Sequence, residues 1–87
     1  MPLLNVVVHL SHHNPVSSFD AARASGVFGI IHKATEGSTF VDGDYKERRG
    51  QALAAGLRWG AYHFGVREHV LDQVDHFLHT VNLIDSP

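Results

Sequence analysis

Apolar segments alternate along the chain with segments of helical periodicity. A largely apolar, β-branched run from Leu3 to Leu10 is typical of a strand that is buried on both faces of a parallel sheet. Two further apolar runs, Val27 to His32 and Leu57 to Phe64, predict a second and a third strand. The pattern therefore predicts three buried strands with polar or helical segments between them.

Two helices are predicted between these strands, over Phe19 to Ser25 and over Tyr45 to Ala55. Gly26 and Gly56 follow them, at the position where a glycine commonly ends a helix. Side-chain oxygens that can accept hydrogen bonds from the first amide groups of a helix precede both, at Ser17 or Ser18 and at Asp42 or Asp44. A polar loop from Lys33 to Gly43 is expected after the second strand.

The last predicted helix runs from about Glu68 to Val81 and carries an apolar stripe at a spacing of about 3.6 residues. The stripe consists of Val70, Leu71, Val74, Phe77, Leu78 and Val81. The polar residues are expected on the opposite, solvated face, and they are Asp72, Gln73, Asp75, His76 and His79. Leu83 and Ile84 are expected to begin a fourth strand.

Strands and helices alternate in steps of about 30 residues, the size of a βαβ unit. This order predicts a parallel sheet with right-handed crossovers. The fold class is therefore α/β, a partial (β/α) barrel of the TIM type with three βα units, and residues 1–87 form one part of such a barrel. Three strands cannot close a barrel, so we expect an open edge and an exposed apolar face that a homo-oligomer would cover.

The composition excludes several classes of function. Hydrophobic residues make up 44% of the 87 residues, as in a folded protein. The formal net charge of −2, with both signs interspersed, predicts no nucleic-acid or membrane partner. Without cysteine there are no disulfides, thiolate zinc sites or cysteine nucleophiles. The first apolar run lacks a positive flank and is too short for a signal peptide, so we expect a cytoplasmic protein as encoded.

Eight histidines raise the alternative of a metal-binding module, because neutral imidazoles are good metal ligands. Four of them, His9, His12, His13 and His32, lie in predicted strands and loops at a spacing that fits no known zinc signature. Three more, His69, His76 and His79, lie on the polar side of the last helix. We expect neither a metal nor another cofactor.

Ligands of parallel α/β folds bind at the carboxyl ends of the strands. Those ends are unusually polar or aromatic here, and they span His9 to His13, His32 to Gly37 and Tyr62 to Gly65. We therefore expect His9, Glu36 and Tyr62 to lie on one rim. Alternation along the third strand places Tyr62 and Phe64 on one face and His63 on the other.

Five segments carry a resemblance to a known family: His9–Asn14, Gly29–Gly37, Phe40–Asp42, Ala55–Gly65 and Gln73–Leu78. In this order and spacing they resemble the first half of glycoside hydrolase family 25 lysozymes, the muramidases of bacteria and phages. The resemblance extends from about Asn5 to Val81. It implies a barrel that cleaves the β-1,4 bond between N-acetylmuramic acid and N-acetylglucosamine in peptidoglycan, a substrate that belongs to the cell wall.

The resemblance also places candidate substrate-binding residues near the sugar cleft. Glu36 follows the second strand, and Tyr62, His63 and Phe64 end the third. An aromatic ring at the rim of a barrel can stack on the face of a sugar. Each of these residues also has an ordinary structural interpretation, as a loop glutamate or as core packing.

The chain departs from the family pattern at its catalytic positions. The first strand of the family usually ends in Asp-x-Ser-His-His, and His9 stands at the position of that Asp. The main catalytic carboxylates lie in an Asp-x-Glu at the end of a fourth strand, which this chain does not reach. Asp85 comes too soon after Phe77 to replace that Asp, and Pro87 stands where the Glu would be.

Glycoside hydrolysis needs two carboxyl groups about 5–9.5 Å apart, and Glu36 alone supplies half of such a pair. We therefore expect a peptidoglycan hydrolase by lineage that is truncated and inactive on its own. The alternative is a non-enzymatic half-barrel that oligomerises or binds cell-wall glycan weakly.

Overall fold

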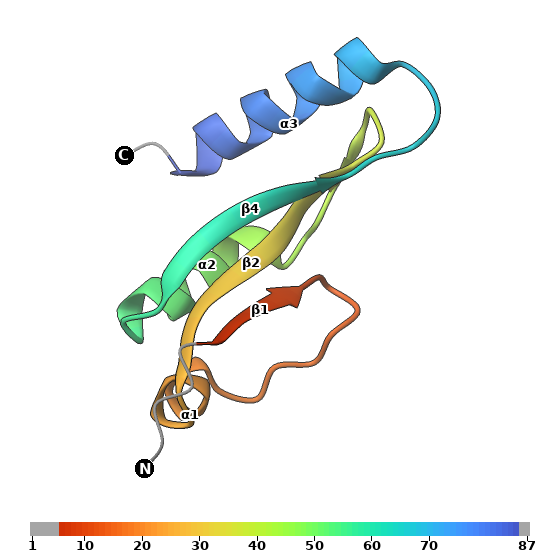
Figure 1. The fold of residues 1–87 in the computed structure, drawn as a ribbon. Helices are drawn as coiled ribbons and strands as arrows, with labels where there is room; N and C mark the ends of the chain where they lie inside the picture. Colours follow the sequence, from red (N-terminus) through yellow and green to blue (C-terminus); the bar gives the residue numbers. More distant parts are fainter. Residues whose placement is uncertain (1–5, 86–87) are drawn as a thin grey trace.

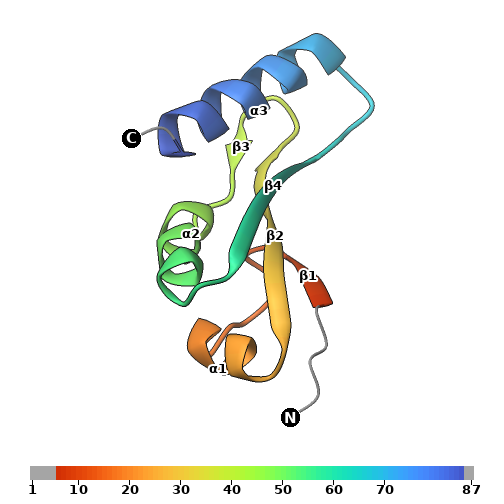
Figure 2. The ribbon, with the colours of Figure 1, turned by 60° about the vertical axis from the view of Figure 1, so that its left-hand side comes forward.

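The computed structural model describes residues 6–85, in which a mixed sheet carries three helices (Figures 1 and 2). The elements, in chain order, are β1 (Val6–Leu10), α1 (Phe19–Ala24), β2 (Val27–Glu36), β3 (Phe40–Val41), α2 (Tyr45–Ala54), β4 (Arg58–Phe64) and α3 (Val70–Asp85). The predicted first strand thus begins at Val6 within the described residues, and its predicted start at Leu3 lies outside them.

The long strand β2 is the centre of the sheet. It pairs in parallel with β1 and with β4, as the alternation of strands and helices predicted. The prediction of a wholly parallel sheet and of a polar loop from Lys33 was wrong. β2 continues to Glu36, and Gly37, with φ at 60°, begins a tight turn to β3, which pairs antiparallel with β2. Because β4 occupies the other side of Glu36, β3 extends the edge that β1 begins.

The small hydrophobic core lies between the sheet and the first two helices. Ile30 of β2 packs with Phe19, Ala52 and Leu57, which come from α1, from α2 and from the start of the third βα repeat. Partly buried apolar side chains surround them: Val8, Leu10, Val16, Val27, Ala55 and Trp59. The face of the sheet that α1 and α2 cover is called the outer face below, and the opposite one the inner face.

The predicted helix ends are confirmed to within one residue for α1 and α2. The Ser18 Oγ accepts a hydrogen bond from Ala21 N at 3.0 Å and so caps α1. Asp44 occupies the cap position of α2 without bonding through its side chain. Gly26 and Gly56 follow the two helices with φ angles of 105° and 84°, which only glycine adopts without strain.

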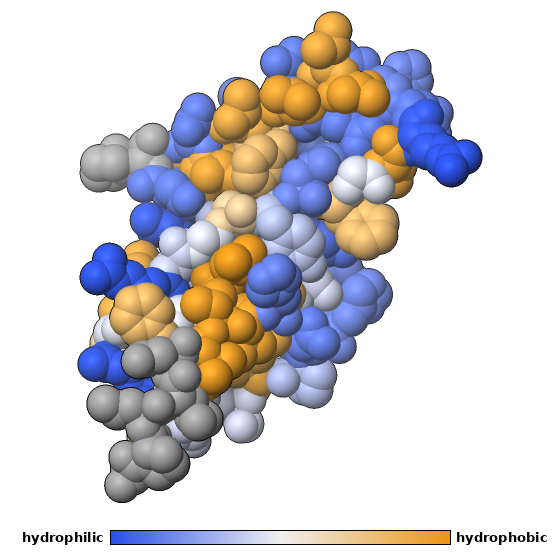
Figure 3. All heavy atoms as spheres, viewed as in Figure 1, coloured by the Kyte–Doolittle hydropathy of each residue, from blue (hydrophilic) through white to orange (hydrophobic). Residues whose placement is uncertain are grey.

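The third helix differs most from the prediction. α3 continues to Asp85, so the expected strand at Leu83 and Ile84 is wrong. The face of α3 that packs against the protein overlaps the expected apolar stripe only at Phe77 and Val81, which are partly buried. Its buried residues are Gln73 and Thr80, whereas Val70, Leu71, Val74 and Leu78 of the apolar stripe are exposed. Figure 3 shows apolar side chains gathered along α3 on the surface of the molecule.

The sheet does not close into a barrel. β1 and β4 each pair only with β2, which leaves one open edge on either side of the described sheet. Among residues 6–85 no helix covers the inner face (Figure 1), and Val7, Phe28 and Phe64 are among its exposed apolar side chains. In the part of the chain that the structure describes, no helix is long and apolar enough to span a membrane.

Candidate functional site

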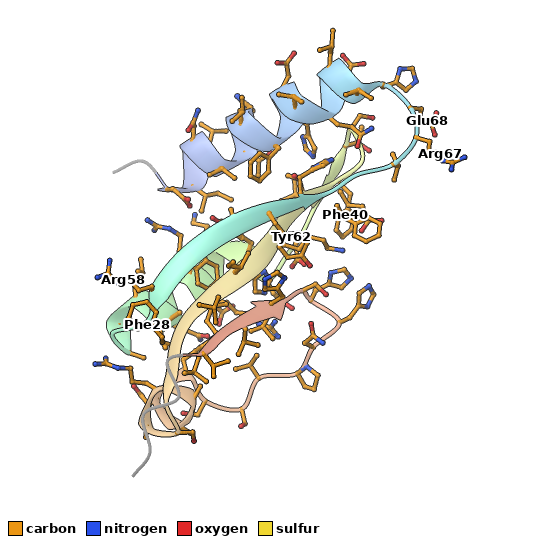
Figure 4. The ribbon with its side chains drawn as sticks, viewed as in Figure 1. Phe28, Phe40, Arg58, Tyr62, Arg67 and Glu68 are labelled. Carbon is orange, nitrogen blue, oxygen red and sulfur yellow. The ribbon has the colours of Figure 1, made fainter. Side chains whose placement is uncertain are left out.

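The carboxyl ends of the strands form one rim, as predicted from the order of the elements. The pairing of Leu10 with His32 and of Lys33 with Tyr62 brings the ends of β1, β2 and β4 side by side. The rings of His9 and Tyr62 are stacked, with 6.2 Å between their centroids and 29° between their planes. Figure 4 shows Tyr62 on the inner face at this end of the sheet.

An ion pair between a buried lysine and a partly exposed glutamate lies on the inner face, where Lys33 is paired with Tyr62. Lys33 is only 3% exposed, and its Nζ donates a hydrogen bond to the Oε1 of Glu36 at 2.7 Å. Its ammonium group also lies 5.3 Å from the ring centroid of Phe40 and 5.7 Å from that of Phe64. The hydrogen bond from Lys33 lowers the pKa of Glu36 below its ordinary value. Glu36 is therefore a fixed anion at neutral pH and is not suited to donate a proton.

The second carboxylate near the rim, that of Asp42, has a structural role. It is buried and accepts hydrogen bonds from the backbone N and the Nδ1 of His12, both at 2.9 Å, and from the backbone N of Asp44 at 2.9 Å. Burial alone would raise the pKa of Asp42, but these hydrogen bonds outweigh it and lower the pKa. Asp42 thus fastens the loop after β1 to the start of α2, a role that the sequence analysis did not assign to it.

His32 is a core histidine. Its Nδ1 donates to the carbonyl oxygen of Lys33 at 2.8 Å, and its Nε2 accepts from Arg48 at 3.2 Å. The ring stacks on Trp59 with 5.5 Å between centroids. Burial lowers the pKa of His32, so the ring is neutral, and the bond from Arg48 leaves no lone pair at Nε2 for a metal ion.

The structure separates His63 from the other candidate residues on β4. Its Nδ1 accepts a hydrogen bond from the Thr35 hydroxyl at 2.7 Å, and its Nε2 donates to the Oε1 of Gln73 at 2.9 Å. Its ring also meets that of Phe77 edge-on at 6.0 Å. His63 therefore links the sheet to α3, whereas Tyr62 and Phe64 lie on the inner face.

Residues 6–85 contain no group of three or more His, Asp or Glu side chains placed to hold a metal ion.

Asp85 lies at the end of α3, where its carboxylate accepts a hydrogen bond from the Tyr45 hydroxyl at 3.0 Å and forms an ion pair with Arg49 at 3.0 Å. It therefore joins α3 to α2 and takes no part in the rim. The rim itself offers an anion, aromatic rings and an imidazole, which suit the binding of a polar ligand with apolar faces.

Residues 8–86 match the sequence profile of glycosyl hydrolases family 25. The chain belongs to this family. The autolytic lysozyme of Clostridium acetobutylicum is 38% identical over 64 residues, which make up 74% of this chain and 20% of that lysozyme. The five segments that carry the family resemblance were thus interpreted correctly.

Solved family 25 structures share the fold of the chain. A family 25 glycosyl hydrolase from Bacillus anthracis superimposes with a TM-score of 0.79 at 27% identity, over 85% of this chain and 35% of that one. The muramidase from Trichobolus zukalii gives a TM-score of 0.75 at 34% identity, over 82% and 35%. A family 25 lysozyme from Aspergillus fumigatus gives 0.74 at 33% identity over the same shares. The chain spans about 35% of the length of these structures.

Proposed function

We propose that the chain forms one side of the sugar-binding rim of a family 25 lysozyme fold. By this proposal its lineage function is hydrolysis of the β-1,4 bond between N-acetylmuramic acid and N-acetylglucosamine in peptidoglycan. Relatives described as lysozymes and muramidases support the substrate class. The observation that carries the proposal is the rim itself, where the Lys33–Glu36 ion pair lies among Tyr62, Phe40 and Phe64 at the ends of adjacent strands.

The same geometry supports binding without cleavage by the chain alone. Hydrolysis of a glycoside needs a carboxylic acid that protonates the leaving oxygen, and such a group usually has a raised pKa. The pKa values of Glu36 and Asp42 are both lowered, and Asp42 is buried behind its hydrogen bonds. His9, at the family Asp position, can donate a proton but cannot supply a fixed negative charge to an oxocarbenium-like centre.

Cosedimentation with insoluble peptidoglycan tests the binding. We expect the chain to sediment with peptidoglycan from a Gram-positive cell wall and to stay in solution with microcrystalline cellulose. Tyr62→Ala should lower the retained fraction several-fold, because it removes a ring from the rim. Arg58→Ala, at the opposite end of the same strand, is the matched control and should be retained like the wild type. Equal retention on cellulose and peptidoglycan, or none on either, would contradict the proposal.

A second candidate function is a non-enzymatic assembly of several copies. The apolar stripe of α3 and the two open edges of the sheet favour it, because exposed apolar surface of this extent commonly marks an interface. The exposed members of the stripe are Val70, Leu71, Val74 and Leu78. The oligomeric state in solution tests this candidate.

A further inference from the structure

The free edge of β4 is long and unprotected. Among residues 6–85, β4 pairs with β2 alone, and Figures 1 and 2 show β2 between β4 and β1. Open strand edges in natural proteins usually carry lysine, proline or a bulge, which hinder pairing with another chain. β4 contains neither lysine nor proline, and its one charged residue, Arg58, stands at its end. This edge is therefore suited to pair with a further strand.

The backbone of β4 presents every second residue to the free edge. The carbonyl oxygen of Phe64 accepts a hydrogen bond from Gly37 N at 3.1 Å, so the backbone groups of Phe64 point toward β2. Along a strand, successive residues direct their backbone groups to alternate edges. The N–H and C=O groups of Trp59, Ala61 and His63 therefore face the free edge, and Ala61 is the middle residue of the strand.

A second copy of β4 fits this edge when the two strands run antiparallel about Ala61. All seven residues of the strand then have a partner. Trp59 lies opposite His63 of the second copy, and the two copies of Ala61 lie opposite each other, so the backbone groups that face the edge can exchange hydrogen bonds. A shift by one residue would oppose groups that face the edge to groups that face β2. A shift by two would leave the strand ends unpaired.

The side chains of the inner face match in the same register. Residues directly opposite each other in an antiparallel pair contact each other on one face of the sheet. Gly60 lies opposite Tyr62 of the second copy, and an aromatic ring in that position covers the backbone that glycine exposes. Arg58 lies opposite Phe64 of the second copy, and a guanidinium group is attracted to the face of an aromatic ring. Phe64 is 53% exposed in the single chain, so its ring is open to this contact.

The apolar stripe of α3 lies beside the same edge. A groove of about 280 Å³ is lined by His63 at the end of β4 and by Val74, Phe77 and Leu78 of α3. Val74 is 48% exposed and Leu78 is 50% exposed. A strand added to β4 would lie next to this groove, so the pairing would cover apolar surface on both faces of the sheet.

We infer that two copies of the chain pair through β4 about a two-fold axis at Ala61 and form one continuous sheet. The inference rests on the second candidate function and assigns the assembly to one edge and one register. A contact of this kind uses the same surface on both copies, so it closes at the dimer. The other open edge, that of β1, offers only five residues in the described part of the chain.

Cross-linking through single cysteines tests the register, because the chain has no cysteine of its own. Opposed residues that exchange backbone hydrogen bonds have Cα atoms about 5.5 Å apart, within the range of a disulfide. Ala61→Cys should therefore form a disulfide-linked dimer under mild oxidation. Ala54→Cys, exposed on α2, and Val8→Cys, in the middle of β1, are the controls and should remain single chains.

Proline at the same position gives a second measurement. Ala61→Pro removes a donor that faces the free edge, and an edge strand tolerates proline there. We expect this variant to keep the circular dichroism spectrum of the wild type and to sediment with half the mass of the wild-type dimer. Gly60→Pro removes a donor that faces β2 and should unfold the chain. If Ala61→Pro also unfolds, the cysteine variants decide.

Three outcomes would overturn the inference and leave the second candidate function standing. They are a wild-type oligomer that cross-links through Val8→Cys and not through Ala61→Cys, equal cross-linking of Ala54→Cys and Ala61→Cys, and a folded Ala61→Pro variant that remains a dimer. A wild type that stays monomeric at every concentration would remove both. Cosedimentation with peptidoglycan does not depend on these results, so the proposed binding of glycan is tested separately.

Discussion

Three histidine side chains, those of His12, His32 and His63, act as hydrogen-bonding links between segments. His12 bonds to Asp42, His32 to Lys33 and Arg48, and His63 to Thr35 and Gln73. Each of these bonds joins a histidine ring to another segment of the chain. Burial lowers the pKa of His32, so this histidine predicts a dependence of stability on pH.

His32 should make the protein less stable in mild acid. Burial lowers the pKa of His32 in the folded state. The unfolded chain therefore binds a proton near pH 6.5, at which the ring of the folded chain is still neutral. The stabilisation is complete above that pH and is lost as the pH falls toward the pKa of the folded state. We expect the free energy of unfolding in urea to fall between pH 7.5 and pH 5.5, with a smaller fall in His32→Gln.

His79→Gln is the control for this experiment, because His79 is exposed on α3. It should follow the wild type at both pH values. An equal loss of stability in wild type and His32→Gln would show that another group titrates. Asp42 also loses stabilisation in acid, because its pKa is lowered, but it does so at pH values below about 4, outside the measured range.

Among the elements, the start of α3 is held by one buried polar side chain, that of Gln73. The Oε1 of Gln73 accepts from His63 at 2.9 Å and from Val66 N at 3.0 Å, and its Nε2 donates to the carbonyl oxygens of Val66 and Glu68. Because Gln73 is buried, these bonds hold the start of α3 and the preceding loop against the end of the sheet.

Gln73→Leu should destabilise the protein by about 2–3 kcal/mol, because it leaves buried polar groups without partners. Urea unfolding measures the loss, and faster hydrogen exchange of the α3 amides would locate it. Gln51→Leu removes only an exposed 3.3 Å bond to Glu47 and should change stability by less than about 0.5 kcal/mol. If Gln73→Leu is as stable as Gln51→Leu, α3 is held by other contacts.

The sequence predicted that α3 is a helix but not which face it buries. Periodicity shows that one face is apolar, and it does not show whether a partner surface is present to cover that face. The hydrogen bonds of Gln73 and the hydrogen bond between His76 and Phe40 O hold a polar part of α3 against the protein. The exposed residues of the apolar stripe lie on another side of the helix. Similarly, the charged residues Lys33 and Glu36 led to the prediction of a loop where β2 continues. Their ion pair lies among aromatic rings in the structure, and composition does not reveal such a pairing.

The position of the candidate site could be predicted from the ends of the strands and from the family resemblance. Glu36, Tyr62 and Phe64 lie at the carboxyl ends of the strands, as expected, and the ring of His9 stacks on that of Tyr62. Phe40 could not be assigned to the rim, because the segment around it was interpreted as a polar loop. Its place depends on the pairing of β3 with β2, which rests on a turn at Gly37.

As a whole, the molecule has a small core and a large uncovered surface. The core on the outer face contains four buried hydrophobic residues, whereas the inner face and the stripe of α3 remain exposed (Figure 3). A short chain with such a surface is only marginally stable as a monomer. The open edges of β1 and β4 offer unpaired backbone groups in addition.

We therefore expect a homodimer or a higher oligomer in solution, measured by light scattering over a range of concentrations. Leu71→Lys with Leu78→Lys should shift the distribution toward monomer, because both side chains lie on the exposed stripe. Leu53→Lys, at an exposed position on α2, is the control and should not. A concentration-independent monomer that unfolds cooperatively above about 60 °C would contradict this expectation.

The proposed function predicts that the 87-residue chain binds cell-wall glycan at its rim but does not cleave it. The most direct test is the release of reducing ends from Gram-positive peptidoglycan by the purified chain, followed together with the turbidity of the suspension. We predict no release above a buffer control, and none from His9→Asp, because a proton-donating carboxyl group would still be absent. Clearing of the suspension by the wild-type chain that Glu36→Gln abolishes would contradict the account.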